Sequence, residues 1–263
     1  MTTVMSKTLN KFNLDFRIGI AGASLPALMD CVQETSLLHT HSIKGAMDYY
    51  DEMGWVWVLT HWQVEVCSYP KLGEHINIAT WPVGFKGYFG TRGYEARNAE
   101  NADNDENSNF ILKANSNWML LDRNTLKPVR PTEYILNKYG ECFDFPITKD
   151  FSMPSLQGTD GFDLLSTHSY IPSRRDIDTN NHVNNISYVR WLYDFIPEDL
   201  YLNCRPSALK VAYKKETRAG DDLTIKLYKR RLADLGENNT EILAIIEKDG
   251  KIATEIYTVW QGE

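Results

Sequence analysis

The second half of the chain contains a helix-length segment that is hydrophobic nearly all round. After Asn185 and up to Ile196, the polar side chains are Ser187, Arg190 and Asp194, which share one narrow stripe at helical spacing. A helix with so few polar positions is normally buried. Pro197 follows and cannot continue the helix. The pattern predicts a buried helix over 185–196.

Alternating apolar and polar positions after this helix predict strands. The runs are 209–213, 223–227, TEILAIIE (240–247) and KIATEIYTVW (251–260). An Asp249-Gly250 pair stands between the last two runs and is a strong hairpin signal. The second half therefore reads as one buried helix followed by an antiparallel sheet.

The first half repeats this plan. Ser24 can cap a helix that has Pro26 in its first turn. Strand-like runs follow: THWQVEVCSY, HINIATW, GYEARNA and FILKANSNWMLLD. The polar segment ENADNDENSN (100–109) separates the last two and is predicted to be a hairpin tip. It lacks the central glycine and closing glutamate of a calcium loop.

The two halves can be overlaid. YPKLGEHINI (69–78) matches ETRAGDDLTI (216–225), and LDFRIGIAGASL (14–25) lies over IDTNNHVNNISY (177–188). Two copies of a helix-plus-sheet unit are the simplest account. The fold class is thus α+β, with domains at 1–135 and 163–263 and a connector at 136–162.

The overlay also separates shared features from those of one copy. Asp178, Asn180 and His182 fall opposite Asp15, Arg17 and Gly19, and Glu216 falls opposite Tyr69. Features present in both copies are expected to be architectural. The reactive side chains are present only in the second copy, which is therefore expected to carry the chemistry.

Composition and charge narrow the classes of function. With 263 residues, 43% hydrophobic and 24% charged, the chain resembles an ordinary globular protein. A net charge of −7 argues against general nucleic-acid binding. Four widely separated cysteines favour reduced thiols, and no apolar stretch approaches the length of a membrane span. The N-terminal residues do not resemble a signal peptide, so we expect a cytoplasmic protein.

The segment DIDTNNHVNN, just before the predicted helix, is the candidate reactive site. Asp178, Asn180 and His182 are spaced by two and would project to one side of an extended segment. The first amides of the helix would lie beside them and could hold an oxyanion. From spacing alone, a turn with a helix cap is the more common explanation. A metal site is less favoured because asparagine is a poor ligand and no second His or Cys is near.

The pattern D-x-N-x-H-V-N-N-x-x-Y-x-x-W resembles the signature of the acyl-acyl carrier protein thioesterases of plants and bacteria. YPKLGEHINIATWP and SNWMLLDRNTLKPVRP also resemble segments of that family. The resemblance implies two tandem hot dog domains, each an antiparallel sheet wrapped around a long helix. It further implies that the second domain is catalytic, that the first selects the acyl chain, and that the enzyme uses no metal or nucleotide cofactor.

The resemblance also assigns site residues. The family's catalytic Asp, Asn and His fall on Asp178, Asn180 and His182, and its catalytic Glu, in a Y-basic-basic-Glu stretch, falls on Glu216. Plant members have a cysteine after that glutamate. This chain has Thr217, which argues against a cysteine acyl-enzyme. Strict alternation along the preceding strand would place Glu216 on the outer face, with Lys210 and Lys214, unless the strand bends.

The expected activity is hydrolysis of fatty acyl-acyl carrier protein, a step that ends fatty acid synthesis. The expected partner is the acidic carrier protein, which basic residues beside Glu216, together with Arg174 and Arg175, could steer. No nucleic acid or membrane partner is expected. An acyl-coenzyme A thioesterase and a non-catalytic acyl-binding module are the alternatives. The sequence leaves open the acyl chain length and the choice between monomer and homodimer.

Overall fold

The structure is a computed structural model that describes residues 11–19, 24–99, 109–156, 161–231 and 239–262. The chain divides into two compact units, which are described separately. Unit 1 comprises residues 1–60 and 64–149, and unit 2 comprises 61–63 and 150–263. The predicted hairpin tip at 100–109 lies, except for its last residue, outside the described residues. None of the described helices is long and apolar enough to cross a membrane.

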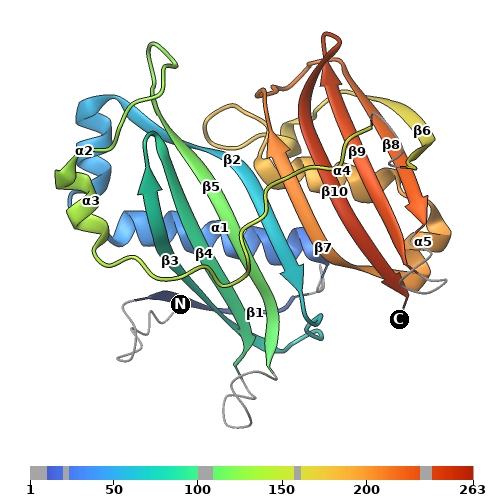
Figure 1. The fold of residues 1–263 in the computed structure, drawn as a ribbon, viewed down its shortest axis with the longest axis horizontal. Coiled ribbons are helices and arrows are strands. Elements are labelled where there is room, and N and C mark those ends of the chain that lie inside the picture. Colours follow the sequence, from blue (N-terminus) through green and yellow to red (C-terminus); the bar gives the residue numbers. More distant parts are fainter. Residues whose placement is uncertain (1–10, 20–23, 100–108, 157–160, 232–238, 263) are drawn as a thin grey trace. The chain divides into compact units, whose positions relative to one another are not determined.

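Unit 1 is an antiparallel sheet with a long helix on one face. Its strands are β1 (Phe12–Arg17), β2 (Trp55–Val66), β3 (His75–Lys86), β4 (Phe89–Asn98) and β5 (Phe110–Asp122), in the spatial order β1-β3-β4-β5-β2 (Figure 1). Its helices are α1 (Leu25–Ser42), α2 (Ala46–Met53) and α3 (Glu133–Tyr139).

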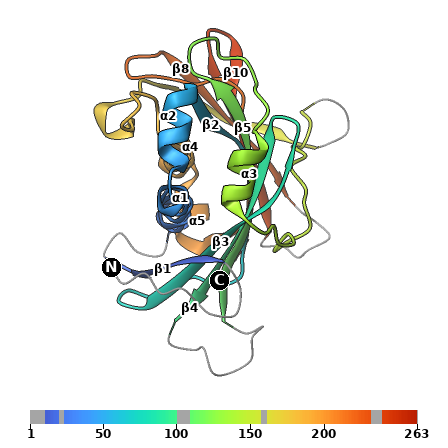
Figure 2. The ribbon, with the colours of Figure 1, turned by 90° about the vertical axis from the view of Figure 1, so that its left-hand side faces the viewer.

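The long helix α1 supplies much of the core of unit 1. It begins as predicted, because the Ser24 side chain caps it and Pro26 occupies the first turn, where the missing N–H costs nothing. Leu28 and Val32 of α1 are fully buried, and α1 lies against β1 and β3 (Figure 2). Ile78 of β3 is equally buried. These contacts fix α1 against the sheet through hydrophobic burial.

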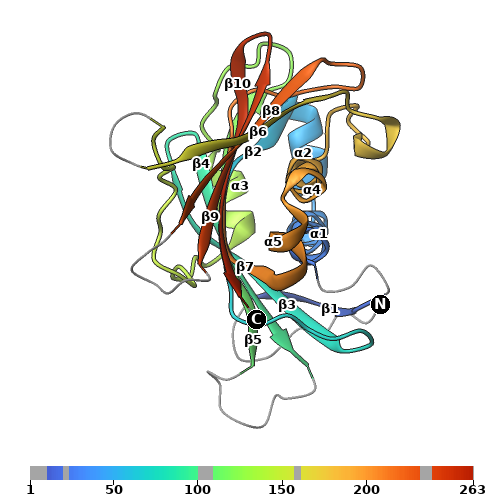
Figure 3. The ribbon, with the colours of Figure 1, turned by 90° about the vertical axis from the view of Figure 1, so that its right-hand side faces the viewer.

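Unit 2 has the same plan. Its strands are β6 (Asp163–Tyr170), β7 (Cys204–Tyr213), β8 (Leu223–Arg231), β9 (Thr240–Lys248) and β10 (Lys251–Gly262), in the order β6-β8-β9-β10-β7. A 3₁₀ turn, η1 (Arg174–Asp176), precedes α4 (Asn185–Phe195), and α5 (Glu198–Asn203) follows it. Figure 3 shows α4 and α5 on one face of this sheet.

The predicted helix and hairpin of unit 2 are both confirmed. Ile186, Val189 and Leu192 of α4 are buried, as the nearly all-apolar pattern indicated. Asp249 and Gly250 both have positive φ, 53° and 68°, and join β9 to β10. Two such residues are what a tight hairpin turn requires.

The strand order confirms the internal repeat and corrects part of the overlay. Leu14 of β1 lies opposite Ile78, and His168 of β6 lies opposite Ile225, so β6 is the counterpart of β1. Placing 14–25 over 177–188 was therefore wrong in its strand portion. Unit 2 has a longer connection, 171–184, between its first strand and its helix than unit 1 has. Asp178, Asn180 and His182 lie in this extra length, and so are not counterparts of Asp15, Arg17 and Gly19.

Candidate active site

The segment from Asp178 to His182 is a tight turn, not the extended segment that was predicted. The Asp178 N–H donates to the His182 carbonyl at 2.8 Å, and the Asn181 N–H donates to the Asp178 carbonyl at 3.2 Å. Asn181 has φ of 61°, a conformation that asparagine tolerates well. The hydrogen bonds that the Asp178 side chain makes with nearby backbone N–H groups favour a turn over the extended conformation that the spacing of two had predicted.

The Asp178 carboxylate organises this turn. Its Oδ1 accepts the backbone N–H of Asn180 at 2.8 Å and that of His182 at 3.2 Å. Its Oδ2 accepts the Asn180 side-chain amide at 3.4 Å. The structure thus brings the three predicted residues together through Asp178, which holds the backbone that carries the other two.

A second aspartate, Asp176, anchors the turn to the helix from beneath. It is 4% exposed and accepts hydrogen bonds from the Ser173 N–H and hydroxyl, the Tyr170 hydroxyl and the Trp191 indole. Burial alone would raise the pKa of Asp176, but these hydrogen bonds outweigh burial and hold the pKa below its ordinary value. Sequence reasoning assigned Asp176 no role. The available signal was the Tyr170 and Trp191 pair, whose polar tips need an acceptor when buried.

Glu216 lies in the loop after β7, not within the strand. Strand β7 ends at Tyr213, so alternation no longer dictates the direction of Glu216. The neighbouring Thr217 is fully buried and fixes the loop. Its carbonyl accepts a hydrogen bond from the Val183 N–H at 2.9 Å, and its hydroxyl group is hydrogen-bonded to the Tyr188 hydroxyl at 2.7 Å. Because the chain leaves the strand at Tyr213, Glu216 is not forced onto the outer face of the sheet with Lys210 and Lys214, as alternation had predicted. Thr217 is too buried to act as an attacking nucleophile.

His182 and Glu216 meet at the surface of unit 2. The His182 Nε2 atom lies 2.9 Å from Glu216 Oε2, with side chains 36% and 50% exposed. Arg218 also lies beside them: its Nη2 atom is 3.3 Å from His182 Nε2 and 3.9 Å from Glu216 Oε1. The arrangement combines a carboxylate, an imidazole and a guanidinium that solvent can reach. Such a group can remove a proton from water and stabilise negative charge.

Two of the first amides of α4, those of Ile186 and Ser187, are engaged by the helix cap and do not face the reacting groups as free donors. Asn184 is the N-cap: its side-chain oxygen accepts the Ile186 N–H at 2.8 Å, and its carbonyl accepts the Ser187 N–H at 2.9 Å. The cap interpretation of the asparagines is therefore correct for Asn184. The Asn184 cap and the cluster of Asp178, Asn180 and His182 on the preceding turn are both present.

Several lysines beside the site have acidic partners within unit 2. Lys210 pairs with Asp150, Lys214 with Glu255 at 2.7 Å and Lys215 with Asp249 at 3.4 Å. The Lys210 ion pair and its hydrogen bonds hold the pKa of Asp150 well below its usual range. These pairs reduce the net positive charge that the sequence suggested for this rim.

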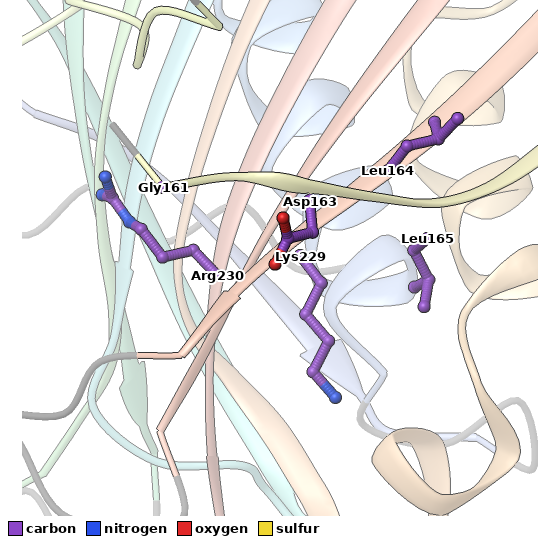
Figure 4. A pocket seen from close by; sticks show the side chains of 6 residues that line it. All are labelled: Gly161, Asp163, Leu164, Leu165, Lys229 and Arg230. Carbon is purple, nitrogen blue, oxygen red and sulfur yellow. The ribbon is translucent and has the colours of Figure 1, made fainter. Parts of the chain in front are cut away.

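A pocket of about 340 Å³ lies elsewhere in unit 2, at the edge formed by β6 and β8. Its lining residues are Gly161, Asp163, Leu164, Leu165, Lys229 and Arg230 (Figure 4). Lys229 and Arg230 diverge there, as neighbouring strand residues do. This lining includes none of the four predicted catalytic residues.

The chain matches known proteins over almost its entire length. The family model for the N-terminal domain of acyl-acyl carrier protein (acyl-ACP) thioesterases matches residues 10–139, and that for the C-terminal domain matches residues 163–262. The chain is 26% identical over 227 residues to a palmitoyl-acyl carrier protein thioesterase of Gossypium hirsutum, covering 83% of this chain and 52% of that protein. It is 22% identical over 222 residues to oleoyl-acyl carrier protein thioesterase 2 of Arabidopsis thaliana, covering 78% and 58%. The chain spans little more than half the length of these curated relatives.

Solved structures show the same fold. An acyl-ACP thioesterase from Bacteroides thetaiotaomicron superimposes with a TM-score of 0.76 at 21% identity, covering 98% of this chain and 100% of that one. The 12:0-ACP thioesterase from Umbellularia californica gives a TM-score of 0.80 at 19% identity, covering 96% and 94%. The chain therefore has the tandem hot dog fold and belongs to the acyl-ACP thioesterase family.

Proposed function

We propose that this protein hydrolyses the thioester of a fatty acyl chain carried on ACP, releasing the free acid and the carrier thiol. The observation that carries the proposal is the 2.9 Å contact of His182 with Glu216 in the domain that matches the family's C-terminal model. The names of the curated relatives, which are palmitoyl-, oleoyl- and dodecanoyl-ACP hydrolases, support the substrate class.

Glu216 is the proposed general base. Its carboxylate takes a proton from water while the water oxygen bonds to the thioester carbon and the carbonyl electron pair moves to oxygen. The tetrahedral intermediate then expels the thiolate, which takes up the proton held by Glu216. A thiol with a pKa of about 8.5 leaves readily. The main barrier is therefore the formation of the intermediate.

His182 and Asn180 are proposed to orient the water and the thioester carbonyl. Both project from the turn that Asp178 holds, and His182 contacts Glu216 directly. Asp178 is a positioning residue in this scheme, since its carboxylate is engaged with backbone N–H groups and the Asn180 amide. A rigid turn reduces the reorganisation that the transition state requires.

Unit 1 is proposed to select the acyl chain. It matches the family's N-terminal domain, and apolar side chains of α1 and its sheet form its core. Each methylene of the acyl chain that is buried against such side chains would contribute about 0.8 kcal/mol, so the number that unit 1 can bury would set the preferred chain length.

Thiol release measured with one acyl chain on ACP and on coenzyme A tests the proposal. We expect a higher kcat/KM for the ACP thioester across a series of chain lengths. A clear preference for coenzyme A would assign the alternative substrate. Binding of acyl-ACP without turnover, at every chain length, would overturn hydrolysis in favour of an acyl-binding module.

A further inference from the structure

Arg218 stands beside the proposed base and has no role in the scheme above. Its Nη2 atom lies 3.3 Å from His182 Nε2 and 3.9 Å from Glu216 Oε1, and its side chain is 63% exposed. It follows Glu216 by two residues, with the buried Thr217 between them. The two side chains therefore share the same accessible side of the loop.

The backbone that carries Arg218 is fixed. The Arg218 N–H donates to Asp221 Oδ2 at 2.7 Å, and the Asp221 N–H donates back to the Arg218 carbonyl at 3.2 Å. Lys248 holds the same Asp221 carboxylate at 2.6 Å, and the Gly220 N–H donates to the Pro172 carbonyl. A flexible side chain thus extends from a rigid turn, which keeps the guanidinium near the reacting groups.

The contacts of His182 Nε2 are mutually exclusive. The nitrogen can donate to Glu216 only when it carries a proton, and it can accept from Arg218 only when it does not. Arg218 is therefore not committed to His182 while Nε2–H points at Glu216. Its Nη2 atom then lies 3.9 Å from Glu216 Oε1, and the guanidinium, on a side chain that is 63% exposed, has further N–H donors to offer.

Charge moves across this space during hydrolysis. When Glu216 takes the proton from water it becomes neutral, and the same unit of negative charge appears on the former carbonyl oxygen. A cation beside the base therefore loses the negative charge of the Glu216 carboxylate at the moment when negative charge forms on the former carbonyl oxygen. A guanidinium can follow that transfer without changing its own charge.

We propose that Arg218 stabilises the oxyanion of the tetrahedral intermediate and is thus a further catalytic residue of this enzyme. This inference rests on the proposed thioester hydrolysis. It assigns to Arg218 a donor role that the capped amides of Ile186 and Ser187 do not fill. Asn180, whose side-chain amide is exposed on the same turn, is positioned to donate as well.

The test compares Arg218→Gln, Arg218→Lys and Arg218→Ala. Lys251→Gln is the control for loss of an exposed cation from the same unit, and Arg174→Gln is the reference for a change in carrier docking. We expect Arg218→Gln to lower kcat by about 10²-fold with KM nearly unchanged, the size of effect seen when one oxyanion donor is lost. Arg218→Lys should recover part of kcat, and millimolar guanidinium should partly restore Arg218→Ala. Lys251→Gln should leave kcat and KM unchanged.

A short acyl thioester of N-acetylcysteamine separates catalysis from carrier docking. If Arg218 acts on the oxyanion, its variants lose kcat on this small substrate as they do on acyl-ACP. A raised KM on acyl-ACP alone, shared with Arg174→Gln, would show docking instead and overturn the inference. Wild-type protein that hydrolyses none of these substrates would instead refute the proposed function. Full activity of Arg218→Gln alongside an inactive Glu216→Gln would refute only the role of Arg218.

Discussion

Each unit places a histidine against an arginine, but in opposite surroundings. In unit 1, His39 of α1 lies with its Nδ1 atom 2.6 Å from Nη1 of Arg92, which is 8% exposed. Burial, with a smaller contribution from Arg92, lowers the pKa of His39 to about 3. His39 is therefore neutral near pH 7 and accepts a hydrogen bond from a buried guanidinium.

The histidine of unit 2 has the same kind of neighbour and an additional one. His182 contacts Arg218, but Glu216 lies closer, and all three side chains are open to solvent. The two units share their strand order, so the sheet does not explain the difference. The difference comes from the longer connection before α4 and from the bend after β7, because these two segments bring the Glu216 carboxylate to the exposed imidazole of His182.

The largest predicted effect separates these two histidines. His182→Ala should lower kcat/KM by about 10²- to 10⁴-fold, as loss of an acid–base partner does. Its free energy of unfolding should change by less than about 0.5 kcal/mol, because the side chain is exposed. His39→Ala should do the reverse and cost about 1–3 kcal/mol by leaving Arg92 buried without its acceptor. Thiol release and urea unfolding measure both. Equal losses of activity in the two variants would contradict the assignment of a catalytic role to His182 and a structural role to His39.

Asp176 gives the next largest effect, on stability. Asp176→Ala removes the acceptor for Tyr170, Trp191 and Ser173, and should lower the free energy of unfolding by about 3 kcal/mol. Asp176→Asn keeps one acceptor oxygen and should lose less. Because the folded-state pKa of Asp176 is depressed, its ionisation stabilises the protein above the unfolded pKa. That contribution is lost as the pH falls through the folded pKa. Urea unfolding of all three proteins at pH 7 checks the order.

The half-buried His39 predicts a specific dependence of stability on acid pH. Between pH 6.5 and about 3 the unfolded chain binds a proton at His39 that the folded chain does not, so stability falls as the pH is lowered. The slope from this group approaches about 1.4 kcal/mol per pH unit. His39→Asn, which keeps an acceptor but does not titrate, should show a shallower loss between pH 6.5 and 4.5. An unchanged slope would mean that His39 is protonated in the folded protein.

The smallest effect is expected at the rim of the site. Lys215 pairs with Asp249 at 3.4 Å, with side chains 41% and 73% exposed. Exposed pairs of this kind contribute at most about 1 kcal/mol. Lys215→Ala should therefore leave both unfolding and kcat nearly unchanged. A loss comparable to that of Arg218→Gln would show that Lys215 is needed as much as Arg218, and that the effect is not specific to Arg218.

Local patterns predicted much of the fold. Three predictions from short-range patterns are confirmed: the buried helix α4, the Ser24 cap and the Asp249-Gly250 hairpin turn. Helix α2 was missed because it is short and bounded by Gly45 and Gly54, both in the left-handed region. Strand β6 was missed because, as an edge strand, it is mostly exposed and shows little hydrophobic alternation.

The site could be predicted only in part. The density of Asp, Asn and His from 176 to 185 marked a turn before a helix, and both are present. Periodicity argued against Glu216, because alternation cannot anticipate the bend that the buried Thr217 fixes. The resemblance to a family supplied that residue. The contact of Arg218 with His182 depends on the same bend and has no signature in the sequence.

The central claim is that Glu216 acts as the base, and one measurement tests it most directly. Steady-state thiol release from a single acyl-ACP should be compared for wild type, Glu216→Gln and Glu255→Gln, a control glutamate that pairs with Lys214 in the same unit. We predict that Glu216→Gln loses at least about 10²-fold in kcat while the control stays near wild type. A Glu216→Gln enzyme that turns over at the wild-type rate would contradict the account.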